Sequence, residues 1–237
     1  ESSVPGLIGQ LKGILTKRRY MVATIFVDHF SIMDYPVLQQ STTSAETVAA
    51  KESFELYAST MGIRIRHCHA DNGRFAGNLF PESIARCNQT MSFSGVGIHS
   101  QNGKAEKQIQ DLQNAARTML LHAERQWPGA INSHLWPYAL RMASDVYNHA
   151  PRALSEAAPI ELFTGHKMLP LVHHFHHFGC PTFILLSDLQ SGKKGRKWDN
   201  RARVGIYLRR STQHARSVSL ILSLDTGLVS PQYHCSF

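Results

Sequence analysis

The feature that most constrains the fold is a change of pattern along the chain. Up to about residue 164, apolar segments typical of strands alternate with segments that have helical periodicity. Beyond about residue 170, four short β-rich segments follow one another, separated by glycine, serine and charged turns. This order predicts an α/β domain over residues 1–165 and a small, basic all-β barrel over residues 166–237, with the boundary between Thr164 and Pro170.

The first part has clear individual elements. Residues 20–27 are almost continuously apolar, as in a strand buried on both faces. Ser44 is placed to cap a helix that reaches Ser59. A strand over 63–69 runs into the turn Ala-Asp-Asn-Gly. The other elements that we expect are helices over 81–87, 104–124 and 135–149 and strands over 90–93, 182–186, 203–208, 217–222 and 228–233.

The composition excludes several classes of protein. Hydrophobic residues make up 43% of the 237 residues, too many for a disordered chain. No stretch approaches the ~18 consecutive apolar residues of a membrane helix, and the first residues show no signal peptide. The four cysteines are far apart and form no CxxC pair, which argues against a disulfide scaffold or a zinc finger. We expect free, buried thiols in a reducing compartment.

The positive charge is concentrated at one end of the chain. The net charge is +8, and residues 163–237 alone carry ten Lys and Arg against three Asp and Glu. The run from Lys193 to Arg203 surrounds Trp198 with cations, a pattern that suits phosphate contact with aromatic stacking. The alternative is that the segment is a solubilising hairpin of the barrel, and Trp198 could then be a core residue. The candidate DNA-binding residues here are Lys193, Lys194, Arg196, Lys197, Arg201 and Arg203.

Two carboxylates have the positions that metal chemistry requires. Asp71 follows a predicted strand, where a carboxylate can hold a divalent cation, although an Asp that only stabilises its own turn is an alternative. Glu106 lies in the first turn of the long helix, where the helix dipole by itself also favours an acid. Gln110, Gln113 and Arg117 continue a polar stripe from Glu106, opposite an apolar face. A strand-end Asp and a helix Glu suit two-metal phosphoryl transfer on nucleic acid.

The sequence resembles the integrase region of copia-type long-terminal-repeat retrotransposon polyproteins over almost its whole length. The D-N-G block at Asp71 and the Q-N-G-x-x-E block ending at Glu106 stand 35 positions apart, in the order of that family. The other similar runs are Ala23–Ser31, Ala116–Leu120, Leu135–Ala139, Phe178–Pro181, Arg203–Leu208 and Thr226–Ser230.

The resemblance implies a ribonuclease H-like catalytic core followed by an SH3-like barrel. It also implies an Asp-Asp-Glu metal triad, in which Asp71 is the second Asp and Glu106 the Glu. The first Asp of the family falls just ahead of Glu1, and Asp28 belongs to the next block, so Asp28 is at most a surrogate ligand. The family's zinc-binding His/Cys module has no counterpart here, and the histidines of 173–177 do not replace it.

The same resemblance implies the activity and its partners. Two Mg²⁺ (or Mn²⁺) ions would support trimming of element DNA ends and then strand transfer into target DNA, by a homo-oligomer acting in the nucleus after a cytoplasmic particle stage. Lys104, Lys107, Gln110, Gln113 and Arg117 would face the DNA. Because the first Asp falls outside the chain, an inactive fragment that binds nucleic acid without cutting it remains the main alternative, and a purely structural multimerisation piece is a third.

Overall fold

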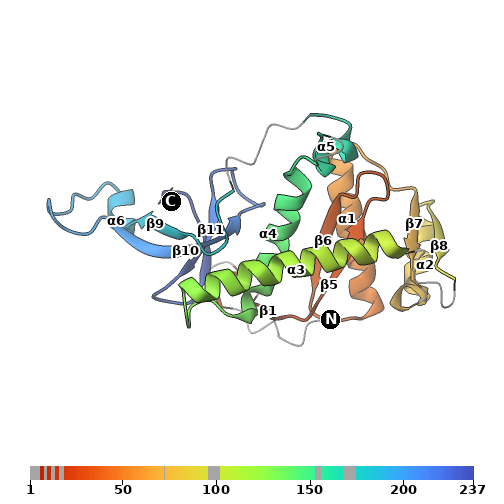
Figure 1. Cartoon of the computed structure of the whole chain (residues 1–237), viewed down its shortest axis with the longest axis horizontal. Coiled ribbons are helices and arrows are strands. Elements are labelled where there is room, and N and C mark those ends of the chain that lie inside the picture. Colours follow the sequence, from red (N-terminus) through yellow and green to blue (C-terminus); the bar gives the residue numbers. More distant parts are fainter. Residues whose placement is uncertain are drawn as a thin grey trace. The chain divides into compact units, whose positions relative to one another are not determined.

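The structure, a computed structural model, describes residues 19–71, 73–95, 102–152, 156–167 and 175–237, together with the backbone of three short strands before them (Figure 1). Contacts divide the chain into two compact units. Beyond Arg19, unit 1 comprises Tyr20–Gln113 and Tyr147–Leu169, and unit 2 comprises Asn114–Val146 and Pro170–Phe237. The predicted domain boundary lies partly outside the described residues and stays a prediction.

Unit 1 is a mixed α/β structure with two separate two-stranded sheets in its described part. Strand β5 (Val22–Val27) pairs with β6 (Asp34–Gln39) in antiparallel register, and β7 (His67–Ala70) pairs with β8 (Thr90–Phe93) in parallel. The helical elements of this unit are α1 (Ser44–Thr60), η1 (Arg74–Ala76), α2 (Leu79–Arg86), the first half of α3 (Gly103–Gln126), the end of α4 (Trp136–His149) and α5 (Pro159–Thr164).

The core of unit 1 lies where α1 and α5 meet the β5–β6 pair. Met33, Phe54, Ile160 and Phe163 are buried there. Phe54 stacks on Phe26 of β5 with ring centroids 5.0 Å apart. Residues of α1 therefore cover one face of the β5–β6 pair, as Figure 1 shows. The sequence predicts that the strand over residues 20–27 is buried on both faces. This is wrong, because only two of the six residues of β5 are buried.

The other predicted elements of unit 1 agree with the structure to within a few residues. Helix α1 is capped by Thr43 and not by Ser44, because the Thr43 side chain accepts the amide hydrogen of Glu46. Strand β7 begins only at His67, so the first half of the strand predicted over 63–69 is irregular. Strand β6 and helix α5 were not predicted.

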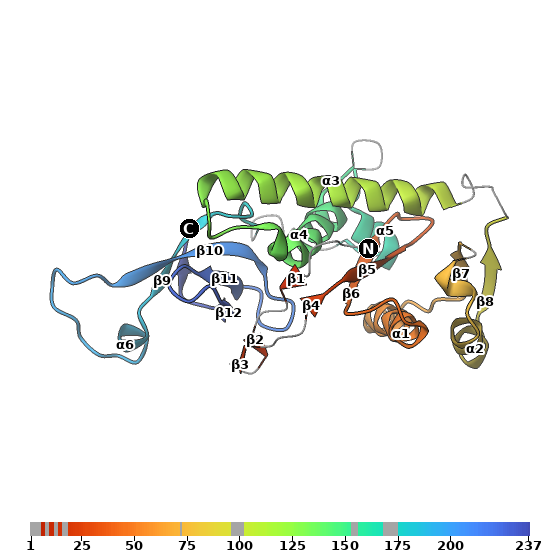
Figure 2. The ribbon, with the colours of Figure 1, turned by 90° about the horizontal axis from the view of Figure 1, so that it is seen from below.

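Unit 2 contains a five-stranded antiparallel sheet of order β12-β11-β10-β9-β13. Figure 2 labels four of these strands, β9 to β12. Ile184, Ile206, Leu208 and Ile221 bury their side chains almost completely. The pairing confirms the run of short strands, whereas an SH3-like barrel stays a prediction. The strands are β9 (Pro181–Leu185), β10 (Ala202–Arg210), β11 (Ser219–Ser223), β12 (Val229–Gln232) and β13 (Cys235–Ser236), with α6 (Ser187–Gln190) after β9 and η3 (Ser133–Leu135) before α4.

Two close approaches fix the packing within unit 2. Gly179 has φ +88, and a Cβ there would lie 2.5 Å from Cβ of Ala123 in α3. The Trp127 indole donates a hydrogen bond of 2.7 Å to the Gly179 carbonyl. On β10, Arg209 is buried and forms an ion pair of 2.7 Å with Asp145 of α4.

The N-terminal segment adds short strands to the described backbone. Strand β1 (Gly6–Leu7) pairs with β4 (Arg19–Tyr20), and β2 (Gln10–Leu11) pairs with β3 (Ile14–Leu15). Among all the described helices, none combines the length and the hydropathy that a membrane crossing needs.

Candidate functional site

Asp71 lies where the sequence predicts it, directly after the last residue of a strand. Its side chain is exposed. The end of β7 is held beside β8, because the Ser94 amide donates a hydrogen bond of 3.0 Å to the Ala70 carbonyl. A Cβ on Gly73 would come within 3.4 Å of the Asp71 carboxylate, so a glycine leaves this carboxylate room to move. Asn72, which the resemblance includes, is outside the described residues.

A ladder of imidazoles and hydroxyls leads along the two parallel strands to Asp71. Side chains two apart on a strand share a face, so His67 and His69 project from the same side of β7, which ends one residue before Asp71. The nitrogens of His67 contact the hydroxyls of Thr90 (2.7 Å) and Ser92 (2.9 Å). His69 contacts Ser92 at 2.8 Å and Ser94 at 3.2 Å. Sequence reasoning missed this ladder, although alternating polar residues over 63–69 were its signal.

Glu106 is exposed in the first turn of α3, on a helix start that its neighbours anchor. Lys104 Nζ donates a hydrogen bond of 3.1 Å to the His29 carbonyl, in the loop after β5. Gln108, which is buried, donates one of 2.7 Å to the carboxylate of Asp34 on β6. Residues on either side of Glu106 therefore bind the β5–β6 hairpin while Glu106 itself faces solvent.

The predicted polar stripe of α3 is present. Glu106, Gln110, Gln113 and Arg117 are all exposed, whereas Leu112 and Ala116 are buried. Lys107 is also exposed and forms an ion pair of 2.9 Å with Asp111. The sequence from Ser94 to Gly103, just before and at the start of α3, is rich in glycine, and we expect this loop to flex and so to place Glu106. Residues 96–101 lie outside the described residues, so this stays a prediction.

Asp28 has a structural role in a tight turn. Its Oδ2 accepts hydrogen bonds from the amide and hydroxyl of Ser31, both at 2.7 Å, and from the amide of Phe30 at 3.2 Å. The turn contains Ile32 with φ +58, a conformation that a β-branched side chain strongly disfavours. These bonds give Asp28 a role in holding the strained turn, and its use as a surrogate metal ligand stays a prediction.

The described residues contain no group of three or more His, Cys, Asp or Glu side chains placed to hold a metal ion. Asp71 and Glu106 are therefore each exposed, but the described residues do not bring them together with a third ligand. The two histidines at 173 and 174 lie outside the described residues, and His176 stacks on Phe237 with ring centroids 3.5 Å apart.

The basic loop of unit 2, residues 193–203, runs from just after α6 into the first two residues of β10 and is largely open to solvent. Trp198 is 89% exposed, so the alternative that places it in the core is wrong. Lys197 Nζ lies 5.5 Å from the centre of the indole ring. Lys193 pairs with Asp188 at 2.9 Å on the surface, and Asp199 accepts the Arg196 amide hydrogen. Arg203 is half-buried and the other five cations are exposed, as a phosphate-binding surface requires.

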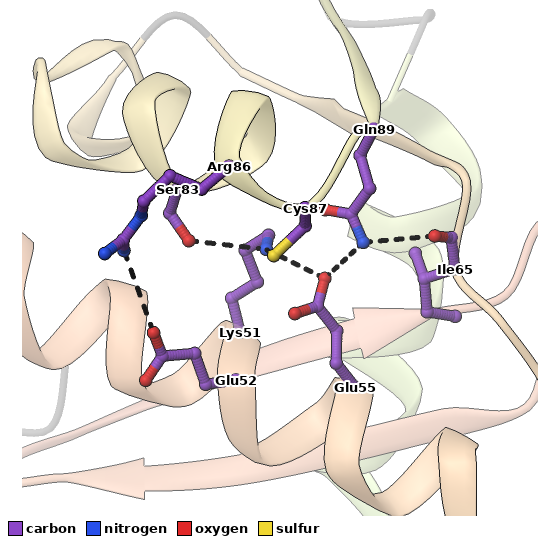
Figure 3. Close-up of polar contacts among 8 residues, drawn as sticks. All are labelled: Lys51, Glu52, Glu55, Ile65, Ser83, Arg86, Cys87 and Gln89. Atoms are coloured by element: carbon purple, nitrogen blue, oxygen red, sulfur yellow. Dashed lines mark hydrogen bonds and ion pairs between the residues drawn. The ribbon is translucent and has the colours of Figure 1, made fainter.

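A buried lysine in unit 1 was not predicted (Figure 3). The Lys51 side chain is 1% exposed, and its ammonium group forms an ion pair of 2.8 Å with Glu55 one turn further along α1. The same ammonium lies 3.4 Å from the Ser83 hydroxyl and 3.7 Å from the Cys87 sulfur. The Gln89 amide donates to Glu55 and to the Ile65 carbonyl, so the cluster joins α1, α2 and the approach to β8.

The four cysteines are free, as expected, but the expectation that all are buried is wrong. Cys87 is exposed, and Cys68, Cys180 and Cys235 are partly buried. Burial raises the pKa of the Cys68 thiol to about 11, although the nearby Lys51 ammonium opposes the shift. Burial also raises the pKa of Cys180 and of Cys235. In unit 2, burial raises the pKa of the Tyr207 phenol to about 12.

Comparison with known proteins gives structural similarity alone. No protein-family model matches the chain, and no curated protein matches it. Among solved structures, the HTLV-2 integrase catalytic core domain in complex with magnesium matches 69% of this chain and 99% of its own, with 20% identity and a TM-score of 0.46. The BIV integrase catalytic core domain matches 60% of this chain and 84% of its own, with 15% identity and a TM-score of 0.45.

A third similar structure is a chain of the simian T-cell lymphotropic virus intasome in complex with PP2A regulatory subunit B56 gamma. It matches 99% of this chain and 79% of its own, with 16% identity and a TM-score of 0.49. The structural neighbours are thus retroviral integrases.

Proposed function

We propose that this chain is part of a retrotransposon integrase that trims the ends of element DNA and joins them to target DNA. The proposal depends chiefly on one observation: Asp71 and Glu106, which stand 35 positions apart in motifs resembling copia integrases, are both exposed at the ends of ordered elements. An exposed carboxylate at a strand end and another at a helix start are accessible to a metal ion and to DNA.

The donor chemistry of these two residues suits magnesium, because carboxylate oxygens are its usual protein ligands. In two-metal sites, bound ions about 4 Å apart stabilise the attacking and the leaving oxygen. Such sites usually need three carboxylates, and the described residues hold no three-ligand group. We therefore infer that a third carboxylate completes the site.

The chain's own surface residues would hold the DNA. On α3, Lys104, Gln110, Gln113 and Arg117 can contact phosphates, and Lys107 can exchange its weak surface pair with Asp111 for a phosphate. In unit 2, the cations of the basic loop provide a second contact. With the DNA held, a 3′-hydroxyl attacks a target phosphodiester in line, and the new P–O bond forms as the P–O3′ bond of the target strand breaks. The target's own 3′-oxygen leaves as a hydroxyl, and no covalent protein intermediate forms. We propose that the chain acts as a homo-oligomer in the nucleus.

A manganese-dependent nicking and strand-transfer assay on a labelled duplex tests this proposal. Asp71→Asn and Glu106→Gln should each abolish product and leave the melting temperature nearly unchanged, because both side chains are exposed. Asp111→Asn is the matched control, a carboxylate on the same helix that is part of a surface pair, and it should keep activity. Residual activity in either of the first two variants refutes the assignment.

The same experiment separates the rival function. If the wild-type chain folds and binds DNA with a steep salt dependence but makes no product, the chain is a nucleic-acid-binding fragment. Binding should then survive both Asp71→Asn and Glu106→Gln. No DNA affinity at physiological salt would instead favour a multimerisation piece.

A further inference from the structure

Unit 2 contains a pocket of about 590 Å³ that the proposed chemistry does not use. Its volume lies within the range of roughly 300–1,000 Å³ typical of ligand sites. Residues of β9 and β13, the start of β10 and the segment before β11 line it. The lining residues with aromatic or imidazole rings are His176, Phe183, Tyr233, His234 and Phe237.

Two of these rings, His176 and Phe237, pack against each other and against the interior of unit 2. Phe237 stacks on His176 at 3.5 Å with an interplanar angle of 10°. The fully buried Tyr207 meets both rings edge-on, with centroids 5.4 Å away, and supports them from the interior. Phe237 is nevertheless 44% exposed, Phe183 is 51% exposed and Tyr233 is 61% exposed. Large aromatic surface that is open to solvent in this way favours a flat apolar ligand.

The charge around the pocket favours an anionic ligand. None of the lining residues is acidic, and Arg216 is an exposed member of the lining. Arg203 adds a second positive charge, close enough to the lining residue Cys235 to oppose the rise that burial causes in its thiol pKa. The surrounding segment 163–237 carries ten cations against three acids. A ligand with flat apolar rings and negative charge satisfies both requirements.

We propose that this pocket binds unpaired nucleotides of single-stranded nucleic acid, with bases stacking on Phe183 and Tyr233 and a phosphate bound by Arg216. In a duplex the faces of each base are covered by neighbouring pairs, so only an unpaired base can present its face to these rings. The site requires neither Asp71 nor Glu106, and it adds single-strand binding to a chain for which the proposed function requires only duplex contacts.

Fluorescence anisotropy with labelled oligothymidylate of about 12 nucleotides, and with a duplex of equal length, tests this site. The buffer contains EDTA and about 50 mM salt, so that metal chemistry is absent and electrostatic contacts persist. Tyr233→Ala and Phe183→Ala should each weaken binding of the single strand about tenfold or more and change duplex binding less than about twofold. Tyr233→Phe keeps the ring and should bind like the wild type.

Control variants make the outcome decisive. Phe30→Ala removes an aromatic side chain of unit 1 that is 80% exposed, and it should leave single-strand binding unchanged. Arg216→Ala should reduce the slope of log K against log salt concentration by about one, as expected for the loss of one phosphate contact. Circular dichroism confirms folding of each variant, and both exposed rings can be removed separately.

Three results would overturn the site. The first is unchanged single-strand binding in both alanine variants, and the second is an equal loss for single strand and duplex. The third is a concentration-dependent dimer that Tyr233→Ala abolishes without any effect on nucleic acid, which would assign the pocket to a second copy of the chain. Because Asp71→Asn should bind oligothymidylate normally, failure of the strand-transfer proposal would be a separate result.

Discussion

The buried ion pair of α1 provides a sharp test of the energetics of unit 1. Lys51→Met keeps the length and apolar stem of the side chain but removes the ammonium group 2.8 Å from Glu55. The Glu55 carboxylate then keeps only the Gln89 amide as a described partner, in a site where its side chain is 19% exposed. Breaking a buried pair in this way usually costs about 3–5 kcal/mol.

The structure places the expected loss at the lower end of that range. Glu55 lines a pocket of about 450 Å³ that opens to solvent, so water partly compensates the unpaired carboxylate. We therefore expect Lys51→Met to lower the free energy of unfolding by about 3 kcal/mol. Adding Glu55→Leu removes the stranded charge, and the double variant should return to within about 1 kcal/mol of the wild type.

Lys107→Met is the matched control, because Lys107 and Asp111 have the same spacing in a helix. Their side chains are 68% and 44% exposed and 2.9 Å apart, so the loss should be at most about 0.5 kcal/mol. Urea unfolding followed by circular dichroism measures all four proteins. A loss below about 1 kcal/mol for Lys51→Met, or an equal loss in the control, would show that burial does not govern the strength of the Lys51 pair.

Three further predictions follow from the turn, the phenol and the thiols. Asp28→Ala removes three hydrogen bonds from a strained turn and should lower the free energy of unfolding by about 2 kcal/mol, whereas Asp71→Ala should change it by less than about 0.5 kcal/mol; equal effects in urea titrations would contradict this. Burial raises the pKa of the Tyr207 phenol from 10.0 to about 12. The phenol's contribution to the free energy of unfolding is therefore complete below about pH 10, and it is lost as the pH rises towards 12, because the unfolded chain loses this proton first. The stability difference between the wild type and Tyr207→Phe should therefore fall by roughly 2 kcal/mol between about pH 9 and pH 12, and a constant difference would refute it. At about pH 8, iodoacetamide should modify the exposed Cys87 at least about tenfold faster than Cys68, whose pKa burial raises to about 11; peptide mass spectrometry showing equal rates would contradict this.

The elements that could be predicted from sequence are those whose pattern is local. The apolar face of α3 and the four residues of β8 are visible as periodicity. Strand β6 is not, because it contains Pro36, which lacks an amide hydrogen and suits only an edge strand. Strand β6 is instead stabilised by its antiparallel pairing with β5, a contact that the local sequence does not show. Helix α5 has only six residues, too few for a periodic signal.

The candidate site divides in the same way. The positions of Asp71 and Glu106 follow from a turn motif and a helix start, both of which are local. The burial of Lys51 depends on Ser83 and Cys87, more than thirty residues away, and lysine is a residue type that sequence reasoning places in solvent. The role of Asp28 likewise depends on the turn, whose amide and hydroxyl groups donate hydrogen bonds to the Asp28 carboxylate. The run Ala23–Ser31 that contains Asp28 does not by itself distinguish this structural role from metal binding.

The contact between Gly179 and Ala123 has a consequence for how the chain can change over evolution. Two separate requirements keep glycine at position 179. Its backbone is left-handed, and a Cβ at this position would lie only 2.5 Å from Cβ of Ala123. Shortening Ala123 to glycine would relieve only the second, at a cost of about 1 kcal/mol in the helix. A compensating exchange between the two positions is therefore blocked, and we expect descendants of a shared ancestor to keep glycine at 179 while 123 varies only among the smallest residues.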